Sequence, residues 1–212
     1  MIAQSLWQSC ETVAKAALDH PFVQGLADGS LPPQRFARYM EQDAYFLDAF
    51  ARAYAMALAK SPDRDGFFAF KELLDGVLDE LTLHQELAQR HNLNLQPEPS
   101  PATLAYTDFL LRVAAMASVG EIVAAMTPCM RLYAWLGQQL SGKLSQTSPY
   151  RDWVMTYSSA EFEALAARLE SLLDRYGQGY ISVPAHYRRA MALEYAFFDE
   201  AWRVTGETPP PK

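Results

Sequence analysis

Apolar residues recur along most of the chain at intervals of three and four, the spacing of one face of an α-helix. Clear stripes of this kind begin at Phe36, Ile122, Phe162 and Tyr187. No stretch of convincing length alternates between apolar and polar residues, as a half-buried β-strand would. The spacing therefore predicts an all-α fold, an up-and-down helical bundle of seven to eight helices.

Helix starts are marked by serines and prolines in front of these stripes. A serine at the N-cap accepts a hydrogen bond from a backbone N–H of the first turn. A proline in the first turn loses no helical hydrogen bond, because an N–H at that place would have no partner within the helix. A Glu three residues after the Ser completes a capping box. His20-Pro21 ends the first helix. The predicted starts are Ser30 before Pro32-Pro33, Ser61-Pro62, Ser100-Pro101, Ser118 with Glu121, Ser148-Pro149, Ser158 with Glu161, and Ser182 before Pro184.

The 212 residues show no shift in composition that would divide the chain, and half of them are apolar. A chain of this length can bury a sizeable core without disulfides or metals. We therefore predict one helical domain over residues 1–205. The last residues are rich in proline, so residues 206–212 are predicted to form a flexible C-terminal tail.

Charge and cysteine content exclude several classes of protein. The chain has 18 Lys and Arg against 25 Asp and Glu, a net charge of −7. Binding to a nucleic-acid backbone needs a basic face, so no nucleic-acid partner is expected. Two cysteines cannot build a disulfide framework, which favours a reducing compartment. The sequence contains neither a signal-peptide pattern nor a membrane-span pattern, so we expect a cytoplasmic protein with no membrane partner.

Three chemically active side chains lie on apolar stripes. Asp43 and Glu194 place carboxylates where burial is costly unless they are paired or hydrogen-bonded. Each is either an internally satisfied acid or a group that waits for a polar ligand. Burial would raise the pKa of Glu194 toward neutrality, as general acid–base chemistry requires. Cys129 follows Pro128 on its stripe, and a buried lone cysteine is most often a small hydrophobe. Cys10 is predicted to be such a small buried hydrophobe.

Aromatic residues are numerous, with 11 Tyr, 11 Phe and 4 Trp. Tyr106, Tyr133 and Tyr157 lie at or near apolar helix faces. Buried tyrosines usually complete a core with one hydrogen bond. Gathered around two acids and a thiol, they would instead suit a flat, nitrogen-rich aromatic ligand.

Glu80 and His84 share one helix face, and such an acid–histidine pair can belong to a metal site. A di-iron bundle needs two acid–histidine pairs on facing helices, together with further Glu residues. The sequence offers no second pair, and an intrahelical interaction accounts for the first. We therefore predict neither a metal nor another cofactor. A metal-dependent oxygenase on the same bundle is the alternative that this pair leaves open.

Ordered motifs from Leu6 to Arg203 resemble the TenA (thiaminase II) family. Each motif is modest alone, and their order and spacing make the resemblance specific. The motifs are His20-Pro21-Phe22-Val23-Gln24-Gly25-Leu26, Asp28-Gly29-Ser30-Leu31, Arg35-Phe36 with Gln42-Asp43, Pro128-Cys129 with Tyr133 and Gly137, Trp153 with Tyr157 and Glu161-Phe162, and Glu194-Tyr195-Ala196-Phe197-Phe198-Asp199.

The resemblance implies a haem-oxygenase-like helical fold, usually assembled as a homotetramer. It also implies hydrolysis at the methylene carbon attached to a 4-aminopyrimidine ring. The substrate would be thiamin or 4-amino-5-aminomethyl-2-methylpyrimidine, and the product hydroxymethylpyrimidine, which is salvaged into thiamin. A non-catalytic pyrimidine-binding or regulatory protein is a further alternative, because family members were once regarded as regulators.

The resemblance also implies roles for individual residues. Cys129 matches the nucleophile, Glu194 the acid and Asp43 the carboxylate that binds the aminopyrimidine. The residues implied to contact the substrate or line its site are Tyr133, Tyr157, Tyr106 and Phe50. Phe46 stands where many members have a tyrosine one turn after the binding Asp, so this site lacks that hydroxyl. This departure leaves the preferred substrate and the activation of the thiol open.

Overall fold

The computed structural model describes residues 1–91 and 93–203, with the side chains of residues 83–91 excluded. All regular structure in these ranges is helical, which confirms the all-α prediction. The predicted tail at 206–212 lies outside the described residues. The helices are α1 (Ile2–Ser9), α2 (Glu11–Leu18), α3 (Pro21–Asp28), α4 (Pro33–Lys60), α5 (Arg64–His91), α6 (Pro101–Met116), α7 (Val119–Ser141), α8 (Arg151–Tyr157), α9 (Ala160–Tyr176) and α10 (Val183–Arg203).

The described residues form ten helices rather than seven or eight, because the N-terminal segment divides into three short ones. Cys10 lies between α1 and α2. The break at His20-Pro21 is confirmed, and the His20 ring accepts a hydrogen bond from the backbone of Phe22 at 3.2 Å. Gly29 ends α3 with φ of 83°, a left-handed conformation that glycine adopts without steric cost.

The predicted helix starts are confirmed at Ser100 and Ser118. The Ser100 side chain accepts from the backbone of Thr103. Ser118 and Glu121 form the predicted capping box. The N-cap of α9 is Ser159 and not Ser158, because the Ser159 hydroxyl is the group that accepts from the backbone of Phe162.

Two Ser-Pro pairs precede their helices without capping them. Helix α5 begins at Arg64, where the Asp63 carboxylate accepts from the backbone of Gly66 at 2.9 Å. Helix α8 begins at Arg151, and the Ser148 hydroxyl donates to the Leu26 carbonyl instead. In both places the helix begins two residues after the proline.

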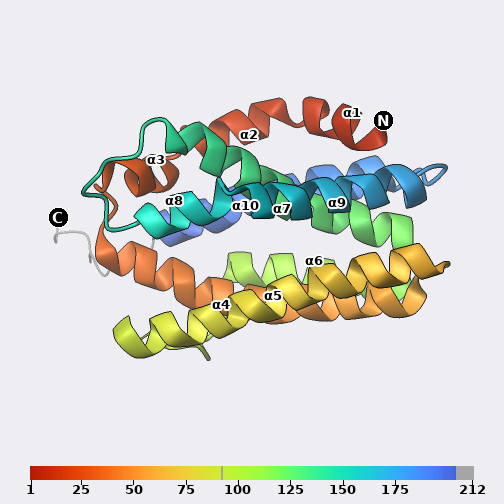
Figure 1. The fold of residues 1–212 in the computed structure, drawn as a ribbon, viewed down its shortest axis with the longest axis horizontal. Helices are drawn as coiled ribbons and strands as arrows, with labels where there is room; N and C mark the ends of the chain where they lie inside the picture. The colour runs from red at the N-terminus through yellow and green to blue at the C-terminus, as the bar shows by residue number, and fades with distance from the viewer. Residues whose placement is uncertain (92, 204–212) are drawn as a thin grey trace, which may run out of the picture.

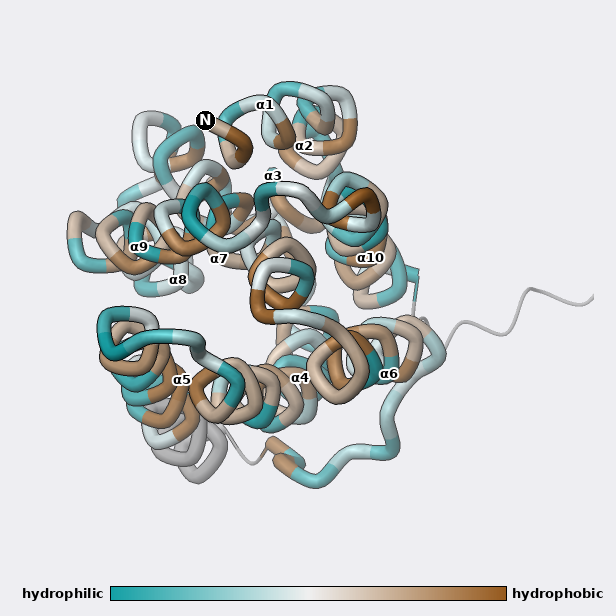
Figure 2. The backbone as a smooth tube through the Cα atoms, turned by 90° about the vertical axis from the view of Figure 1, so that its right-hand side faces the viewer, coloured by the Kyte–Doolittle hydropathy of each residue, from teal (hydrophilic) through white to brown (hydrophobic). Residues whose placement is uncertain are grey.

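The long helices run along the longest axis of the molecule, as Figure 1 shows. Viewed from one end, α4 lies between α5 and α6 in one layer, and α7 to α10 form a second layer (Figure 2). Helix α7 packs against α8, α9 and α10, and the layers meet where α4 and α6 contact α7 and α10. Buried apolar side chains from all ten helices form one core cluster.

No described helix has the length and apolar character needed to cross a membrane.

Candidate active site

A cavity of about 270 Å³ lies where α5 faces α7, α8 and α9, with α4 as its remaining wall. It is smaller than the roughly 300–1,000 Å³ of sites for drug-sized ligands, so it suits a small molecule. The described residues that line it are Asp43, Phe46, Leu47, Phe50, Leu73, Gly76, Val77, Asp79, Glu80, Cys129, Met130, Tyr133, Thr156, Tyr157, Phe162 and Leu165.

Helix α4 presents Asp43, Phe46 and Phe50 to this cavity. Their spacing of three and four places them on one helix face, which is the stripe identified in the sequence. Asp43 is buried, with only 5% of its surface exposed. Burial raises the pKa of Asp43 well above its usual range, and the charges of Glu80 and Glu194 raise it further. The site therefore gathers several carboxyl groups in a small, poorly solvated space.

Glu194 on α10 lies beside the Cys129 thiol on α7, and the two side chains are hydrogen-bonded. The Tyr106 hydroxyl on α6 donates to the same carboxylate at 2.5 Å. Burial raises the pKa of Glu194 to about 7, although both hydrogen bonds act in the opposite direction. This carboxyl group can therefore accept or release a proton near neutral pH.

Burial also raises the pKa of the Cys129 thiol well above its usual range, and the charges of Glu194, Asp43 and Glu80 add to the effect. The resting side chain is therefore a thiol and not a thiolate. A thiol of this kind needs an adjacent proton acceptor before it can act as a nucleophile. The carboxylate of Glu194 is in the right place to be that acceptor.

Tyr133 and Tyr157 form an aromatic wall, with ring centroids 4.9 Å apart. The Tyr39 hydroxyl fixes Tyr133 by donating to its oxygen at 3.1 Å. Gly137 on α7 permits the close approach of α8, because a Cβ there would lie 2.4 Å from the backbone of Tyr157. A larger residue at position 137 would push this part of the wall away.

The structure brings together all eight residues that the sequence singled out. Asp43, Phe46, Phe50, Cys129, Tyr133 and Tyr157 line the cavity itself. Tyr106 and Glu194 lie behind the thiol and reach it through the hydrogen bonds described above. Cys10, by contrast, is buried at the junction of α1 and α2 and does not line the cavity.

Glu80 is a further acid of the cavity, beyond the eight residues predicted from the sequence. It lines the cavity, and its carboxylate accepts a hydrogen bond from the Tyr157 hydroxyl at 2.9 Å. The signal was present, because Leu73, Val77 and Glu80 follow helical spacing and place an acid on an apolar stripe. The spacing of four residues also fits a pair with His84, whose side chain lies outside the described residues.

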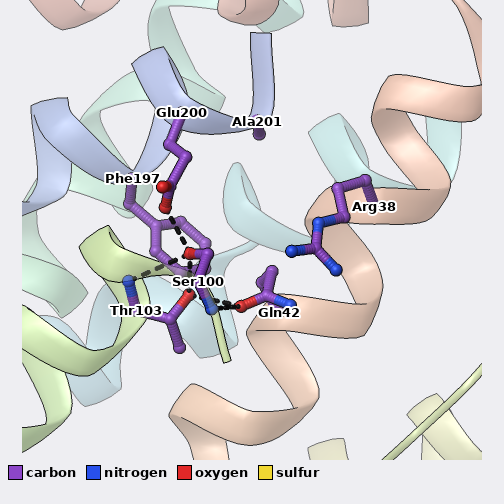
Figure 3. A pocket seen from close by; sticks show the side chains of 7 residues that line it. All are labelled: Arg38, Gln42, Ser100, Thr103, Phe197, Glu200 and Ala201. Atoms are coloured by element: carbon purple, nitrogen blue, oxygen red, sulfur yellow. Dashed lines mark hydrogen bonds between the residues drawn. The ribbon is translucent and has the colours of Figure 1, made fainter. Parts of the chain in front are cut away.

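A second polar cluster fixes α6, the helix that carries Tyr106 (Figure 3). The backbone N–H of Ser100 and the hydroxyl of Thr103 both donate to the Gln42 side chain, at 2.8 and 2.7 Å. Glu200 accepts from the Ser100 hydroxyl and, at 2.9 Å, from the backbone N–H of Ala102. The cluster thus ties the start of α6 to α4 and α10, the helices of Asp43 and Glu194.

Comparison with known proteins identifies the family. Residues 7–204 match the model of the TENA/THI-4/PQQC family. The chain belongs to this family. The match confirms the resemblance to TenA proteins that the motifs indicated. A relative from Halalkalibacterium halodurans, named aminopyrimidine aminohydrolase, is 34% identical, with 94% of this chain and 95% of that protein aligned.

Solved structures of TenA proteins have the same architecture. A TenA homologue from P. horikoshii superposes with a TM-score of 0.89 at 30% identity, over 96% of this chain and 99% of that one. A Shewanella denitrificans domain with a heme oxygenase-like fold superposes with a TM-score of 0.67 at 16% identity, over 94% of this chain and 91% of that one. The predicted haem-oxygenase-like fold is thereby confirmed.

Proposed function

We propose that this TENA/THI-4/PQQC family protein is a thiamin-salvage hydrolase. It acts at the methylene carbon on a 4-aminopyrimidine ring and releases hydroxymethylpyrimidine from thiamin or from 4-amino-5-aminomethyl-2-methylpyrimidine. The observation that carries the proposal is the Cys129 thiol, hydrogen-bonded to buried Glu194, on the wall of an aromatic cavity shared with Asp43. The name of the Halalkalibacterium halodurans relative supports it.

The proposed reaction begins with transfer of the Cys129 proton to the Glu194 carboxylate. The sulfur then forms a bond to a ring carbon, and a ring nitrogen takes up a proton from an acid of the site. Addition breaks the aromaticity of the ring, so its electrons can expel the group on the methylene. Water adds to the exocyclic alkene, and the thiol leaves as the ring is restored. Covalent catalysis of this type replaces one difficult step with several easier ones.

Binding residues complete the proposal. The buried Asp43 carboxyl group is suited to hydrogen-bond the amino group and ring nitrogen of an aminopyrimidine. Tyr133, Tyr157, Phe46 and Phe50 offer ring faces and edges against which a flat heterocycle can stack. Tyr106 orients Glu194 through its hydrogen bond. Recognition and reaction are thus assigned to adjoining parts of one cavity.

The test is turnover by the purified protein. It is incubated with the aminomethylpyrimidine and, separately, with thiamin, and hydroxymethylpyrimidine is quantified by chromatography. We expect product from at least one substrate, and the ratio of the two rates identifies the preferred leaving group. Binding of both compounds without product would contradict the proposal and favour a pyrimidine-binding role.

A homotetramer and a cytoplasmic location stay predictions. The first follows from the family resemblance, and the second from the cysteine content and the sequence patterns. Light scattering on the purified protein measures the mass of the assembly directly. A mass near that of one 23.8 kDa chain would contradict the tetramer.

A further inference from the structure

Glu80 lies on α5, the helix that faces α8 and α9 across the end of the molecule seen in Figure 2. Its carboxylate is directed across the cavity, because it accepts the hydrogen bond from Tyr157 on α8. Asp79, the preceding residue on the helix, is exposed, whereas Glu80 is half-buried. Both acids line the cavity, but Glu80 is the less exposed of the two and the one that Tyr157 hydrogen-bonds.

The bond from Tyr157 occupies only part of what the Glu80 carboxylate can bind. An ionised carboxylate accepts up to about four hydrogen bonds. Burial raises the pKa of Glu80 because its charge is poorly solvated there. A cationic donor beside it would form a charge-assisted hydrogen bond, which is about twice as strong as a neutral one. The chemistry of this position thus favours an ammonium group.

Glu80 also lies within electrostatic reach of both Asp43 and Cys129, since its charge acts on each of them. In the proposed reaction, the thiol adds to a ring carbon bonded to the one that carries the methylene, because only then can ring electrons expel the leaving group. The leaving group therefore sits close to the sulfur. Glu194 serves the sulfur and Asp43 the aminopyrimidine, which leaves Glu80 for the substituent on the methylene.

We propose that Glu80 is a specificity-determining residue whose carboxylate binds the ammonium group on the methylene of the aminomethylpyrimidine. This inference rests on the proposed function. When the C–N bond breaks, its electron pair leaves on nitrogen as neutral ammonia, and Glu80 remains a carboxylate. The product carries a neutral hydroxyl group at the same place. The site therefore holds the amine substrate more tightly than its alcohol product.

The test measures binding and not turnover. In a Cys129→Ala background, calorimetry gives the affinity for the aminomethylpyrimidine and for hydroxymethylpyrimidine, with and without Glu80→Gln. We expect Glu80→Gln to weaken binding of the amine about tenfold or more, the equivalent of one hydrogen bond to a charged group. Binding of the alcohol should change less than about twofold on the same scale.

A matched control removes the same charge from an exposed place on the same helix. Asp75 is 53% exposed and pairs with Lys71 on the surface, so Asp75→Asn should leave both affinities unchanged. Tyr157→Phe removes the hydrogen bond and keeps the carboxylate, and the preference for the amine should persist.

Two results would overturn the inference. Equal weakening of amine and alcohol by Glu80→Gln would show that Glu80 only supports the cavity wall. Unchanged affinity for both would show that it contacts neither ligand. If the wild-type protein turns over the substrate while either result is found, only this inference fails. If the wild-type protein gives no product from either substrate, the proposed function fails and this inference with it.

Discussion

Two residues of α7, Cys129 and Arg131, lie two positions apart in the sequence and contact acids of neighbouring helices. The two contacts have opposite effects on the pKa of the acids. Arg131 donates to Glu163 on α9 at 2.8 Å and to Glu170 on the same helix at 2.7 Å. Glu194 on α10 is hydrogen-bonded to Cys129 and Tyr106, which are neutral donors. One group of acids has a cationic partner and the other has only neutral partners in these contacts.

The pKa values of the acids separate accordingly. Burial alone would raise the pKa of Glu163, but its bonds to Arg131 and Gln138 and the Arg131 charge lower it below the usual value. Burial raises the pKa of Glu194 to about 7, and its hydrogen bonds offset only part of that. Glu163 is thus fixed as a carboxylate, and Glu194 can exchange a proton at neutral pH. The comparison assigns a structural role to the first group and a reactive role to the second.

The largest effect is expected from the thiol. Cys129→Ala removes the proposed nucleophile and should lower kcat/KM by roughly 10³-fold or more. Cys10→Ala removes a buried thiol outside the cavity and should leave kcat/KM nearly unchanged. Steady-state assays of both variants check this pair. Equal losses in the two variants would contradict the assignment of Cys129 as the nucleophile.

The second prediction concerns stability and pH. Burial raises the pKa of Glu194 to about 7 in the folded state, against an ordinary pKa of 4.5. Its stabilising contribution is fully present below the lower value and is lost as pH rises through the higher one. The loss amounts to about 3 kcal/mol in the free energy of unfolding. Glu194→Gln cannot titrate, so this variant should gain stability relative to wild type between pH 5 and pH 8 in urea unfolding.

The absence of this pH dependence would contradict the assignment of Glu194. A difference between Glu194→Gln and wild type that stays constant from pH 5 to pH 8 would mean that the carboxyl group titrates alike in the folded and unfolded states.

Arg131→Met tests the other group of contacts. It leaves Glu163 and Glu170 without their cation, which would cost several kcal/mol at a fully buried site. These acids are 38% and 23% exposed, so solvent reduces the expected loss of stability to about 1–2 kcal/mol. Denaturant unfolding measures it, and kcat/KM should change little. A large loss of kcat/KM in a folded Arg131→Met protein would contradict the purely structural role assigned to Arg131 and its two acids.

The smallest effect is expected at Phe46, where the cavity lacks a hydroxyl. The Phe46 and Tyr106 ring centroids lie 4.7 Å apart, and Tyr106 is hydrogen-bonded to Glu194, the partner of Cys129. Phe46→Tyr should raise kcat about fivefold, the equivalent of one neutral hydrogen bond of about 1 kcal/mol. A decrease in kcat would show that the added hydroxyl disturbs packing more than it assists the thiol.

The fold and the positions of three site residues followed from local patterns, whereas the roles of those residues, and Phe46 and Phe50, came from the resemblance to TenA proteins. Asp43, Glu194 and Cys129 were found because a polar side chain on an apolar stripe stands out within a single helix. Glu80 produced the same signal and was assigned to a different partner, because spacing along one helix cannot show Tyr157 on another. The helix starts at Asp63 and Ser159 were displaced for a similar reason, since several polar side chains competed for each cap.

Other features depend on contacts between helices and have no local signature. Nothing in the sequence alone places Glu200 at the start of α6, or shows that Gly137 lies against the backbone of Tyr157. The same holds for the hydrogen bond from Tyr106 to Glu194, which joins residues 88 positions apart.

The most direct test compares two acids that contact α7 from neighbouring helices. Glu194→Gln and Glu170→Gln each remove one carboxylate with almost no change in shape, and kcat/KM is measured for both on the aminomethylpyrimidine. We predict a loss of about 10²–10⁴-fold for Glu194→Gln, the usual contribution of general acid–base catalysis. Glu170→Gln should stay within about threefold of wild type, as expected of a group that only stabilises the fold. Equal losses, or a Glu194→Gln protein that retains its activity, would contradict the account.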